Sequence, residues 1–265
     1  MIFNNIVWNI DPEIFHLGPL SVRWYGLLFA MSFFMGYMIF QHFFKKENLK
    51  AELLDSLLIY MMVGVVLGAR LGHCFFYDFD YYMSNPLEIL MIWHGGLASH
   101  GAALGILIAL WLWSRKEKME FLWIIDRIVV TAALGAFFIR MGNLFNSEIY
   151  GVATDLPWGF IFVRNEEVLP KHPTQIYEAL SYLSIFAILI FMYFKNIWFE
   201  QRGKIFGFFL ITVFTARLLI EFIKNPQSDF ESSMVLNMGQ LLSLPFIAVG
   251  IWLMLRKNKN LGLTK

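Results

Sequence analysis

The chain has 265 residues, of which 58% are hydrophobic and only 15% are charged. Soluble domains carry about 25% charged residues. The charges of this chain cluster in short stretches between long apolar runs, which is typical of polytopic membrane proteins. The net charge of +1 says nothing about nucleic acid, but the sequence has no basic stripe that could track a phosphate backbone. A single cysteine, Cys74, excludes an internal disulfide framework, and its apolar neighbours predict a small buried side chain.

Long apolar runs predict about seven spanning helices, because about 20 consecutive apolar residues are enough to cross a bilayer. The runs cover approximately residues 22–44, 53–77, 87–113, 121–142, 174–194, 205–223 and 236–255. Too little polar sequence remains outside them to build a soluble domain. We therefore expect an all-α polytopic membrane protein in which residues 1–265 form a single transmembrane domain.

Basic residues alternate between the connections of these spans. One set of connections holds Lys45, Lys46, Lys50, Arg115, Lys116, Lys118, Lys195, Arg202, Lys204, Arg256, Lys257, Lys259 and Lys265. The opposite set holds only Arg23, Arg164, Lys171 and Lys224. Because cytoplasmic loops carry the excess of Lys and Arg, we expect the N-terminus outside and the C-terminus in the cytoplasm.

Two external segments follow from this orientation. Residues 1–21 mix apolar and polar side chains, which is typical of a segment on the membrane surface. Asp11 and Glu13 interrupt the apolar residues there, so we expect no signal peptide. Residues 143–173 are expected to form a small external cap, in which the run 158–163 has the composition of a strand.

Four arginines remain inside or at the edge of the predicted spans, namely Arg70, Arg127, Arg140 and Arg217. An arginine at a helix centre costs about 2.5–3.5 kcal/mol on insertion scales, so each needs a partner or a function. Arg127 lies near an inner end beside Asp126, which favours a structural or interfacial pair. The other three lie nearer the outer ends of their spans. The polar residues at that level are Tyr25, Asn143, Asn146, Glu148 and Glu221.

Several arginines near only one or two carboxylates predict a net positive pocket for an anion, and guanidinium groups bind phosphate through two parallel hydrogen bonds. Simpler interpretations remain open. Arg217 and Glu221 are spaced i,i+4 and could neutralise each other on one helix face. Arg70 could pair with a backbone carbonyl or a helix end in a structural role.

The third predicted span is rich in small residues over 94–105, which reads HGGLASHGAALG. Small residues permit close packing of helices in a membrane. They also permit a broken backbone, which is tolerated at membrane depth where it lines a cavity. His100 lies among them, and either a core histidine or a working base is compatible with its position, because histidine can accept a proton near neutral pH.

Four stretches of the chain carry a resemblance to a known family. They are the opening with DP at 11–12, GPL at 18–20 and RWYG at 23–26, then GGLASHG at 95–101, RMGNLFNSEIYG at 140–151 and HPTQIYE at 172–178. From about residue 8 to about residue 226 the chain resembles bacterial prolipoprotein diacylglyceryl transferases, and the stretch 140–151 is highly specific for that family. The resemblance implies transfer of a diacylglyceryl group from phosphatidylglycerol to the lipobox cysteine of a prolipoprotein. A thioether forms and glycerol phosphate leaves.

The resemblance also implies the functional residues Tyr25, His100, Arg140, Asn143, Glu148, Gly151, Arg217 and Glu221. We expect catalytic roles for His100, Tyr25, Arg140 and Arg217. We expect substrate-binding roles for Asn143, Asn146, Glu148, Gly151, Glu221 and Arg70. His100 is the expected base for the thiol, and Tyr25 is either the alternative base or the group that orients His100.

Neither a metal nor a cofactor is expected, because no His, Cys and carboxylate spacing suggests a metal site. The expected partners are phosphatidylglycerol, the prolipoprotein signal peptide with its lipobox cysteine, and membrane lipids, but not nucleic acid. The expected location is the bacterial cytoplasmic membrane, with the active site towards the outer face.

Two other classes of protein are compatible with parts of the pattern. A transporter or channel for an anionic solute would also use outer arginines and a helix broken at glycine. The sequence lacks repeated halves and a matching polar set on the cytoplasmic side, which argues against it. An intramembrane protease is disfavoured because the sequence has no His-Glu-x-x-His motif and no serine motif in the small-residue stretch.

Overall fold

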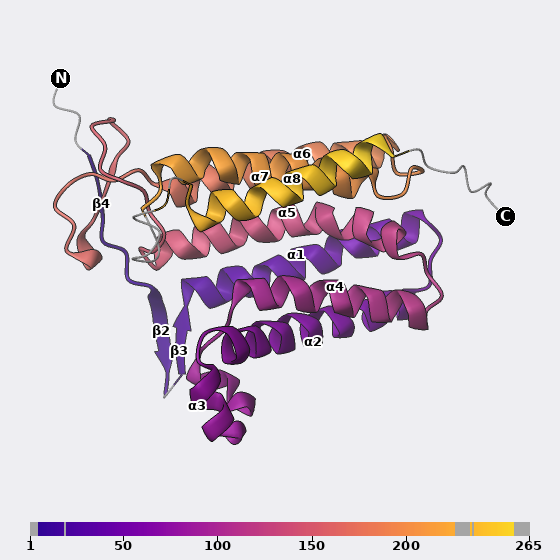
Figure 1. The fold of residues 1–265 in the computed structure, drawn as a ribbon, viewed down its shortest axis with the longest axis horizontal. Coiled ribbons are helices and arrows are strands. Elements are labelled where there is room, and N and C mark those ends of the chain that lie inside the picture. Colours follow the sequence, from indigo (N-terminus) through magenta and orange to yellow (C-terminus); the bar gives the residue numbers. More distant parts are fainter. Residues whose placement is uncertain (1–4, 19, 226–233, 235, 257–265) are drawn as a thin grey trace. The chain divides into compact units, whose positions relative to one another are not determined.

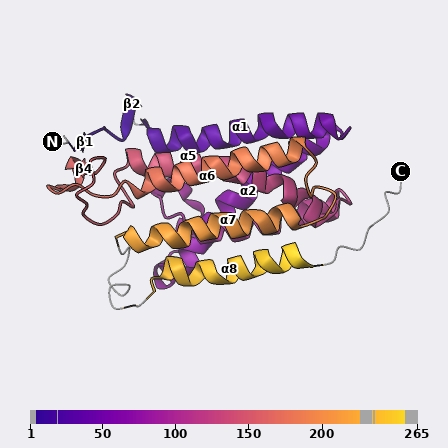
Figure 2. The ribbon, with the colours of Figure 1, turned by 90° about the horizontal axis from the view of Figure 1, so that it is seen from above.

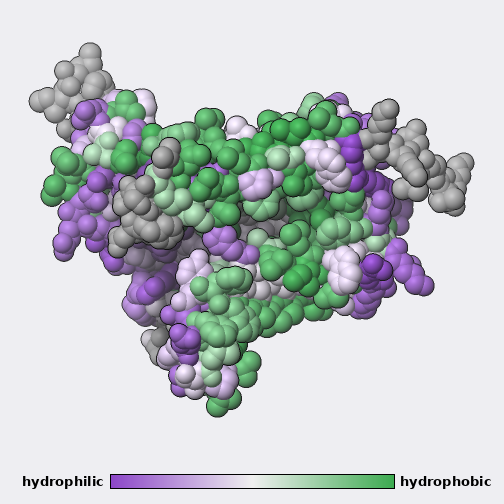
Figure 3. Space-filling model, in the orientation of Figure 1, coloured by the Kyte–Doolittle hydropathy of each residue, from purple (hydrophilic) through white to green (hydrophobic). Residues whose placement is uncertain are grey.

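A computed structural model of the chain describes residues 5–18, 20–225, 234 and 236–256 (Figure 1). Within these residues, six helices are long and apolar enough to cross a membrane. They are α1 (Trp24–Lys46), α2 (Ala51–Phe76), α5 (Phe121–Phe145), α6 (Thr174–Phe194), α7 (Lys204–Ile220, continued by the 3-10 helix η4, Glu221–Ile223) and α8 (Met238–Leu255). The expected all-α polytopic membrane protein is confirmed. Apolar side chains cover much of the helical surface visible in Figure 3, as contact with lipid requires.

The third predicted span, 87–113, differs from the structure. Two short 3-10 helices, η1 (Pro86–Leu90) and η2 (Ile92–His94), precede the regular helix α4, which covers Ser99–Lys116. Gly95 and Gly96 have φ angles of 86° and 71°, a conformation that L side chains rarely adopt. The glycines therefore break the backbone before the helix starts. The remaining 18 residues of α4 end in Arg115 and Lys116, and α4 is not among the six apolar helices.

The structure divides into two compact units. The first unit comprises Met1–Gly36 and Asp126–Lys265, and the second unit comprises Tyr37–Ile125. In the second unit, α2 and α4 lie side by side, and α3 (Phe79–Ser84) follows α2 (Figure 1). Cys74 of α2 is fully buried, as expected from its apolar neighbours.

Glycines bring α2 and α4 into backbone contact. Gly64, Gly68 and Gly72 of α2 face Gly101 and Gly105 of α4. A Cβ atom on Gly101 would lie 2.1 Å from the carbonyl oxygen of Gly68, and one on Gly105 would lie 2.1 Å from that of Gly64. Only glycine permits this approach. Both uses proposed for the small residues of 94–105 are therefore present, since two glycines break the backbone and two pack the helix.

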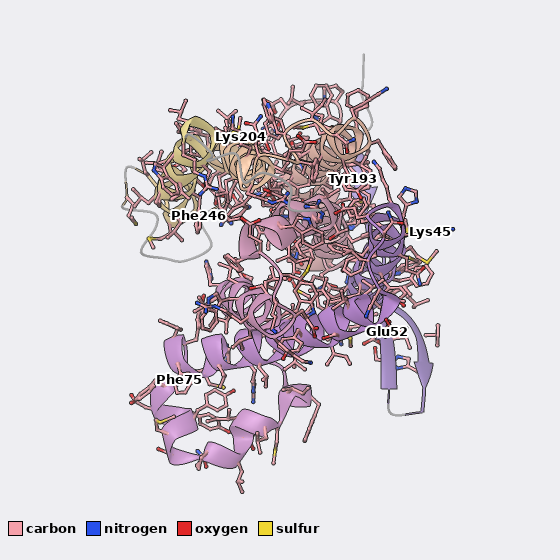
Figure 4. All side chains as sticks on the ribbon, turned by 90° about the vertical axis from the view of Figure 1, so that its right-hand side faces the viewer. Lys45, Glu52, Phe75, Tyr193, Lys204 and Phe246 are labelled. Carbon is pink, nitrogen blue, oxygen red and sulfur yellow. The ribbon has the colours of Figure 1, made fainter. Side chains whose placement is uncertain are left out.

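In the first unit, α6, α7 and α8 run alongside one another in both ribbon views (Figures 1 and 2). Phe246 of α8, labelled in Figure 4, stacks on Phe214 of α7 with ring centroids 4.4 Å apart. At the start of α7, the carboxylate of Asp126 accepts hydrogen bonds from the backbone N–H groups of Gly203 (2.6 Å) and Phe206 (2.9 Å). A carboxylate there satisfies free N–H groups and compensates the positive end of the helix. Asp126 thus has a structural role at the start of α7, and the expected pair with Arg127 stays a prediction.

The N-terminal residues of the first unit form strands. Strand β1 (Ile6–Trp8) pairs in parallel with β4 (Phe160–Phe162), which confirms a strand within the run 158–163. The indole Nε1 of Trp8 donates to the carbonyl of Leu144 at the end of α5 (3.0 Å). Strands β2 (Glu13–Leu17) and β3 (Leu20–Arg23) form an antiparallel pair that leads into α1. The strand contacts therefore hold the start of α1 and the loop after α5 within one unit.

Candidate active site

Arg140 lies near the C-terminal end of α5 and is held from two sides. Its Nε atom lies 2.9 Å from Oε2 of Glu178 in α6, which forms an ion pair. Its Nη1 atom donates to Oδ1 of Asn143 at 3.2 Å. Asn143 follows Arg140 by three residues, so both side chains lie on one face of the helix. The orientation of the guanidinium is therefore determined by one partner on its own helix and one on the next helix.

The turn after α5 continues this network. The Nδ2 atom of Asn143 donates to Oε1 of Glu148 at 2.8 Å, and that of Asn146 donates to the same oxygen at 3.3 Å. Ser147 and Ile149 have positive φ angles of 56° and 61°, so the chain reverses tightly around Glu148. The carboxylate of Glu148 is thereby folded back towards the end of α5.

The first turn of α6 fastens the backbone of the same turn. Gln175 donates from Nε2 to the carbonyl of Glu148 at 2.7 Å, and Thr174 donates from Oγ1 to the carbonyl of Ile149 at 2.9 Å. Both side chains are fully buried. Buried polar groups with hydrogen-bond partners make the position of Glu148 well defined.

Lys224 and two glutamates connect Arg140 to Arg217. The Nζ atom of Lys224 lies 3.2 Å from Oε1 of Glu178 and 3.5 Å from Oε2 of Glu221. The Nε atom of Arg217 lies 4.0 Å from the same oxygen of Glu221. These five residues form a line of alternating charges, which we call the charge chain. Burial lowers the pKa of Lys224, against the effect of the two carboxylates.

Glu178 changes the charge count behind the expected net positive pocket. The charge chain has three cations, Arg140, Arg217 and Lys224, and two carboxylates, Glu178 and Glu221. The expectation overlooked Glu178, a carboxylate inside α6, and the net charge of the pocket stays a prediction. A cation whose donors are not all used by carboxylates would be available to an anion.

Arg217 is such a cation. Its Nε atom is buried and has no hydrogen-bond partner among the residues that the structure describes. The side chain is 32% exposed, whereas that of Arg140 is 15% exposed. The i,i+4 pair of Arg217 and Glu221 exists, but at 4.0 Å it does not use the guanidinium fully.

Tyr25 and Gly151 belong to the same unit as the charge chain. The ring of Tyr25 packs against Gly142 of α5, where a Cβ atom would lie 2.7 Å from Cδ2 of the tyrosine. It is close enough to interact electrostatically with Glu148 and Arg140. A Cβ atom on Gly151 would lie 2.3 Å from the carbonyl oxygen of Ile223, so the glycine permits close contact of two backbone segments. The structure therefore gives Gly151 a backbone role, and contact with substrate stays a prediction.

Arg70 and His100 lie in the second unit. His100 is the second residue of α4, and its side chain is exposed. Arg70 of α2 is buried and directs its donors at five backbone carbonyls. The acceptors belong to Glu88, Ile89, Met91, Gly95 and Gly96. This is the structural alternative considered for Arg70, and the substrate-binding role stays a prediction.

Comparison with known proteins matches the model of the prolipoprotein diacylglyceryl transferase family over residues 12–256. A phosphatidylglycerol–prolipoprotein diacylglyceryl transferase of Chloroherpeton thalassium is 47% identical over 98% of this chain and 97% of its own length. Proteins of the same name from Tolumonas auensis and Porphyromonas gingivalis are 47% and 46% identical, each over 96% of this chain and at least 95% of its own length. The chain belongs to the prolipoprotein diacylglyceryl transferase family.

In this member of the transferase family, the sequence did not predict a site role for two residues of the charge chain, Glu178 and Lys224. A signal for Glu178 was present, because a carboxylate within an apolar helix is costly and needs a partner. Lys224 gave no such signal, since it reads as an ordinary lysine in a connection. Only the fold shows that it is buried between α6 and η4.

The carbonyl contacts of Arg70 should stabilise the irregular segment before α4. Arg70→Lys keeps the charge, but the lysine has all its donors on one nitrogen. It therefore cannot donate hydrogen bonds to five separated carbonyls. A buried carbonyl without a partner costs about 1–3 kcal/mol. We expect backbone amides of residues 88–98 to exchange with solvent about tenfold faster or more, measured by hydrogen–deuterium exchange.

Arg115→Lys is the matched control, because Arg115 lies over the ring of Trp111 in the same unit and contacts none of these carbonyls. Its exchange in residues 88–98 should equal that of the wild type. Unchanged exchange in Arg70→Lys, together with weaker binding of phosphatidylglycerol, would instead assign Arg70 to the substrate.

Proposed function

We propose that the charge chain and the turn around Glu148 form the site where the lipid headgroup binds during diacylglyceryl transfer. The chain transfers the diacylglyceryl group of phosphatidylglycerol to prolipoproteins, the first step of lipoprotein maturation. The acceptor in this proposal is the thiol of the lipobox cysteine. The observation that supports the placement of the site is the guanidinium of Arg217, whose Nε atom has no hydrogen-bond partner in the described part of the chain and lies beside a buried ion network.

The reaction that suits this site is a displacement at carbon. The thiolate sulfur attacks the carbon of the diacylglyceryl moiety that bears the phosphate, and the bond between that carbon and the phosphate oxygen breaks. A thioether forms, and glycerol phosphate leaves with the electron pair as a phosphate monoester. Negative charge therefore grows on phosphate oxygens in the transition state. Arg217 and Arg140 would stabilise this charge, which is most effective in a site of low dielectric constant.

The other residues of the network have supporting roles in this proposal. Asn143 and Asn146 donate to Glu148 in the structure and would also be able to donate to headgroup oxygens. Glu178 orients Arg140, which agrees with their distance of 2.9 Å and with the burial of the carboxylate. Glu221 lies 4.0 Å from Arg217 and would limit the directions that its guanidinium can take.

A base must take the proton of the thiol before or during attack, because the thiolate is the nucleophile. His100 is our candidate, since its side chain is exposed at the start of α4 and histidine accepts protons near neutral pH. Tyr25 is the alternative, either as the base or as the group that orients His100.

We place the protein in the bacterial cytoplasmic membrane as a multi-pass protein, with its site towards the outer face. The distribution of basic residues between the connections supports this orientation. A site at that level is accessible to a lipid that arrives laterally. It is also accessible to a cysteine just beyond the apolar segment of a signal peptide.

Thiol-dependent transfer tests the proposed function. Purified protein incubated with labelled phosphatidylglycerol and a lipobox peptide should give a lipid-labelled peptide, detected by mass spectrometry. The peptide with Cys→Ser should give none, because a hydroxyl is a much weaker nucleophile than a thiolate at neutral pH. Failure of the cysteine peptide to acquire the lipid would refute the transfer, whereas transfer to the serine peptide would refute the thiol mechanism.

The identity of the base is tested by paired variants. If His100 is the base, His100→Asn should lower kcat at neutral pH by about 100-fold or more, within the usual range for general base catalysis. Tyr25→Phe should then lower it less and leave the acidic limb of the pH–rate profile in place. Turnover that survives in His100→Asn and is lost in Tyr25→Phe would assign the base to Tyr25.

A further inference from the structure

Lys224 is the most buried cation of the charge chain, and the proposed displacement assigns it no role. Its side chain is 1% exposed and lies between two carboxylates that are themselves buried. We propose that Lys224 is a positioning residue that holds Glu221 away from Arg217 and so leaves the Arg217 guanidinium available for the anionic headgroup of the lipid substrate. This inference rests on the proposed function, because it concerns the same site.

The distances around Glu221 support this role. Its Oε2 atom lies 3.5 Å from Nζ of Lys224 and 4.0 Å from Nε of Arg217, so the lysine is the nearer cation. An arginine and a glutamate spaced i,i+4 can normally approach within hydrogen-bond distance, about 2.7–3.2 Å. Here Nε of Arg217 has no hydrogen-bond partner among the described residues. The pair is thus held open in the presence of the lysine.

The backbone fixes Lys224 in this position. Lys224 forms an antiparallel bridge with Gly151, and the N–H of Val152 donates to the carbonyl of Ile223 at 3.0 Å. The N–H of Asn225 donates to the carbonyl of Tyr150 at 3.3 Å. Hydrogen bonds on both sides therefore anchor the residue to the loop at 150–152. Its ammonium group is directed inwards, where it meets Glu178 of α6.

The carboxylate of Glu221 is also confined from the side of α8. A Cβ atom on Gly239 would lie 2.6 Å from Cδ of Glu221, so the helix leaves room there only for the carboxylate itself. The side chain of Asn237 donates to the backbone carbonyl of Glu221 at 3.4 Å. With α8 on one side, the carboxylate of Glu221 is shared between Lys224 and Arg217. Removal of the lysine would leave Arg217 as its remaining cation in this set.

Electrostatics then give the direction of the effect. Without Lys224, the buried charge of Glu221 is compensated only if it pairs with Arg217, since an unpaired buried carboxylate is strongly unfavourable. A phosphate would have to displace that carboxylate before it could bind the guanidinium. The role of Lys224 is therefore exerted through Arg217.

Equilibrium binding of phosphatidylglycerol to the purified full-length protein tests this role, with native mass spectrometry as the readout. Lys224→Met should weaken binding about tenfold or more, the size expected when a charge-assisted hydrogen bond is lost. Lys224→Arg should bind within about threefold of the wild type, because it keeps the buried positive charge. The control Lys171→Met removes another partly buried ion pair, at 3.0 Å from Glu167, and should bind like the wild type.

A double-mutant cycle separates action through Arg217 from direct contact with the lipid. In an Arg217→Gln background, Lys224→Met should cause no further loss of binding, because its target is absent. Equal losses of binding in both backgrounds would overturn the proposal. Wild-type binding by Lys224→Met would also overturn it, as would equal losses in Lys224→Met and Lys171→Met.

If Lys224→Met does not fold, the double variant Glu178→Gln/Lys224→Met removes both members of the buried pair. It should bind about tenfold more weakly than Glu178→Gln, and equal binding by these two would overturn the proposal.

Transfer to the lipobox peptide is measured on the same wild-type sample. Wild-type protein that binds phosphatidylglycerol without transferring it would contradict the proposed function and leave the binding test of Lys224 intact. Wild-type protein that transfers the lipid while Lys224→Met binds it normally would contradict the role of Lys224 alone.

Discussion

The ion pair between Glu178 and Lys224 is the contact on which the polar cluster depends. Both side chains are almost completely buried, and each also contacts a second charged residue of the cluster. Removal of one member would leave an uncompensated charge, which is far more costly than loss of a surface pair. Because the pair joins α6 to η4, it also sets the positions of Arg140 and Arg217. Buried carboxylates thus hold the two guanidinium groups in place.

The buried arginines show how the surroundings of a guanidinium determine its use. Arg70 meets five carbonyls next to a backbone broken at Gly95 and Gly96, and it stabilises that irregular segment. Arg217 meets one carboxylate at 4.0 Å, and its Nε atom has no hydrogen-bond partner within the residues that the structure describes. The insertion cost is similar for both. For Arg70 this cost is offset by internal hydrogen bonds. For Arg217 we propose that the guanidinium binds the substrate.

Hydrophobic patterning predicted most of the helices, because apolar runs of sufficient length have few alternatives in a membrane. The span at 87–113 was wrong in its first half, since hydropathy does not detect the positive φ angles at Gly95 and Gly96. Motif residues predicted Arg140, Asn143 and Glu148, which the structure joins by hydrogen bonds. Glu178 and Lys224 were missed as a pair because their contact crosses 46 residues of sequence and exists only in the fold.

A structure of the protein with phosphatidylglycerol bound tests the account most directly. We predict that a phosphate oxygen lies within about 3 Å of the Arg217 guanidinium, while Glu221 remains on the side of Lys224. Asn143 and Arg140 should keep their contacts with Glu148 and Glu178 in that complex. A phosphate bound away from Arg217, or a Glu221 carboxylate closed onto Arg217 in the lipid-bound state, would contradict the account.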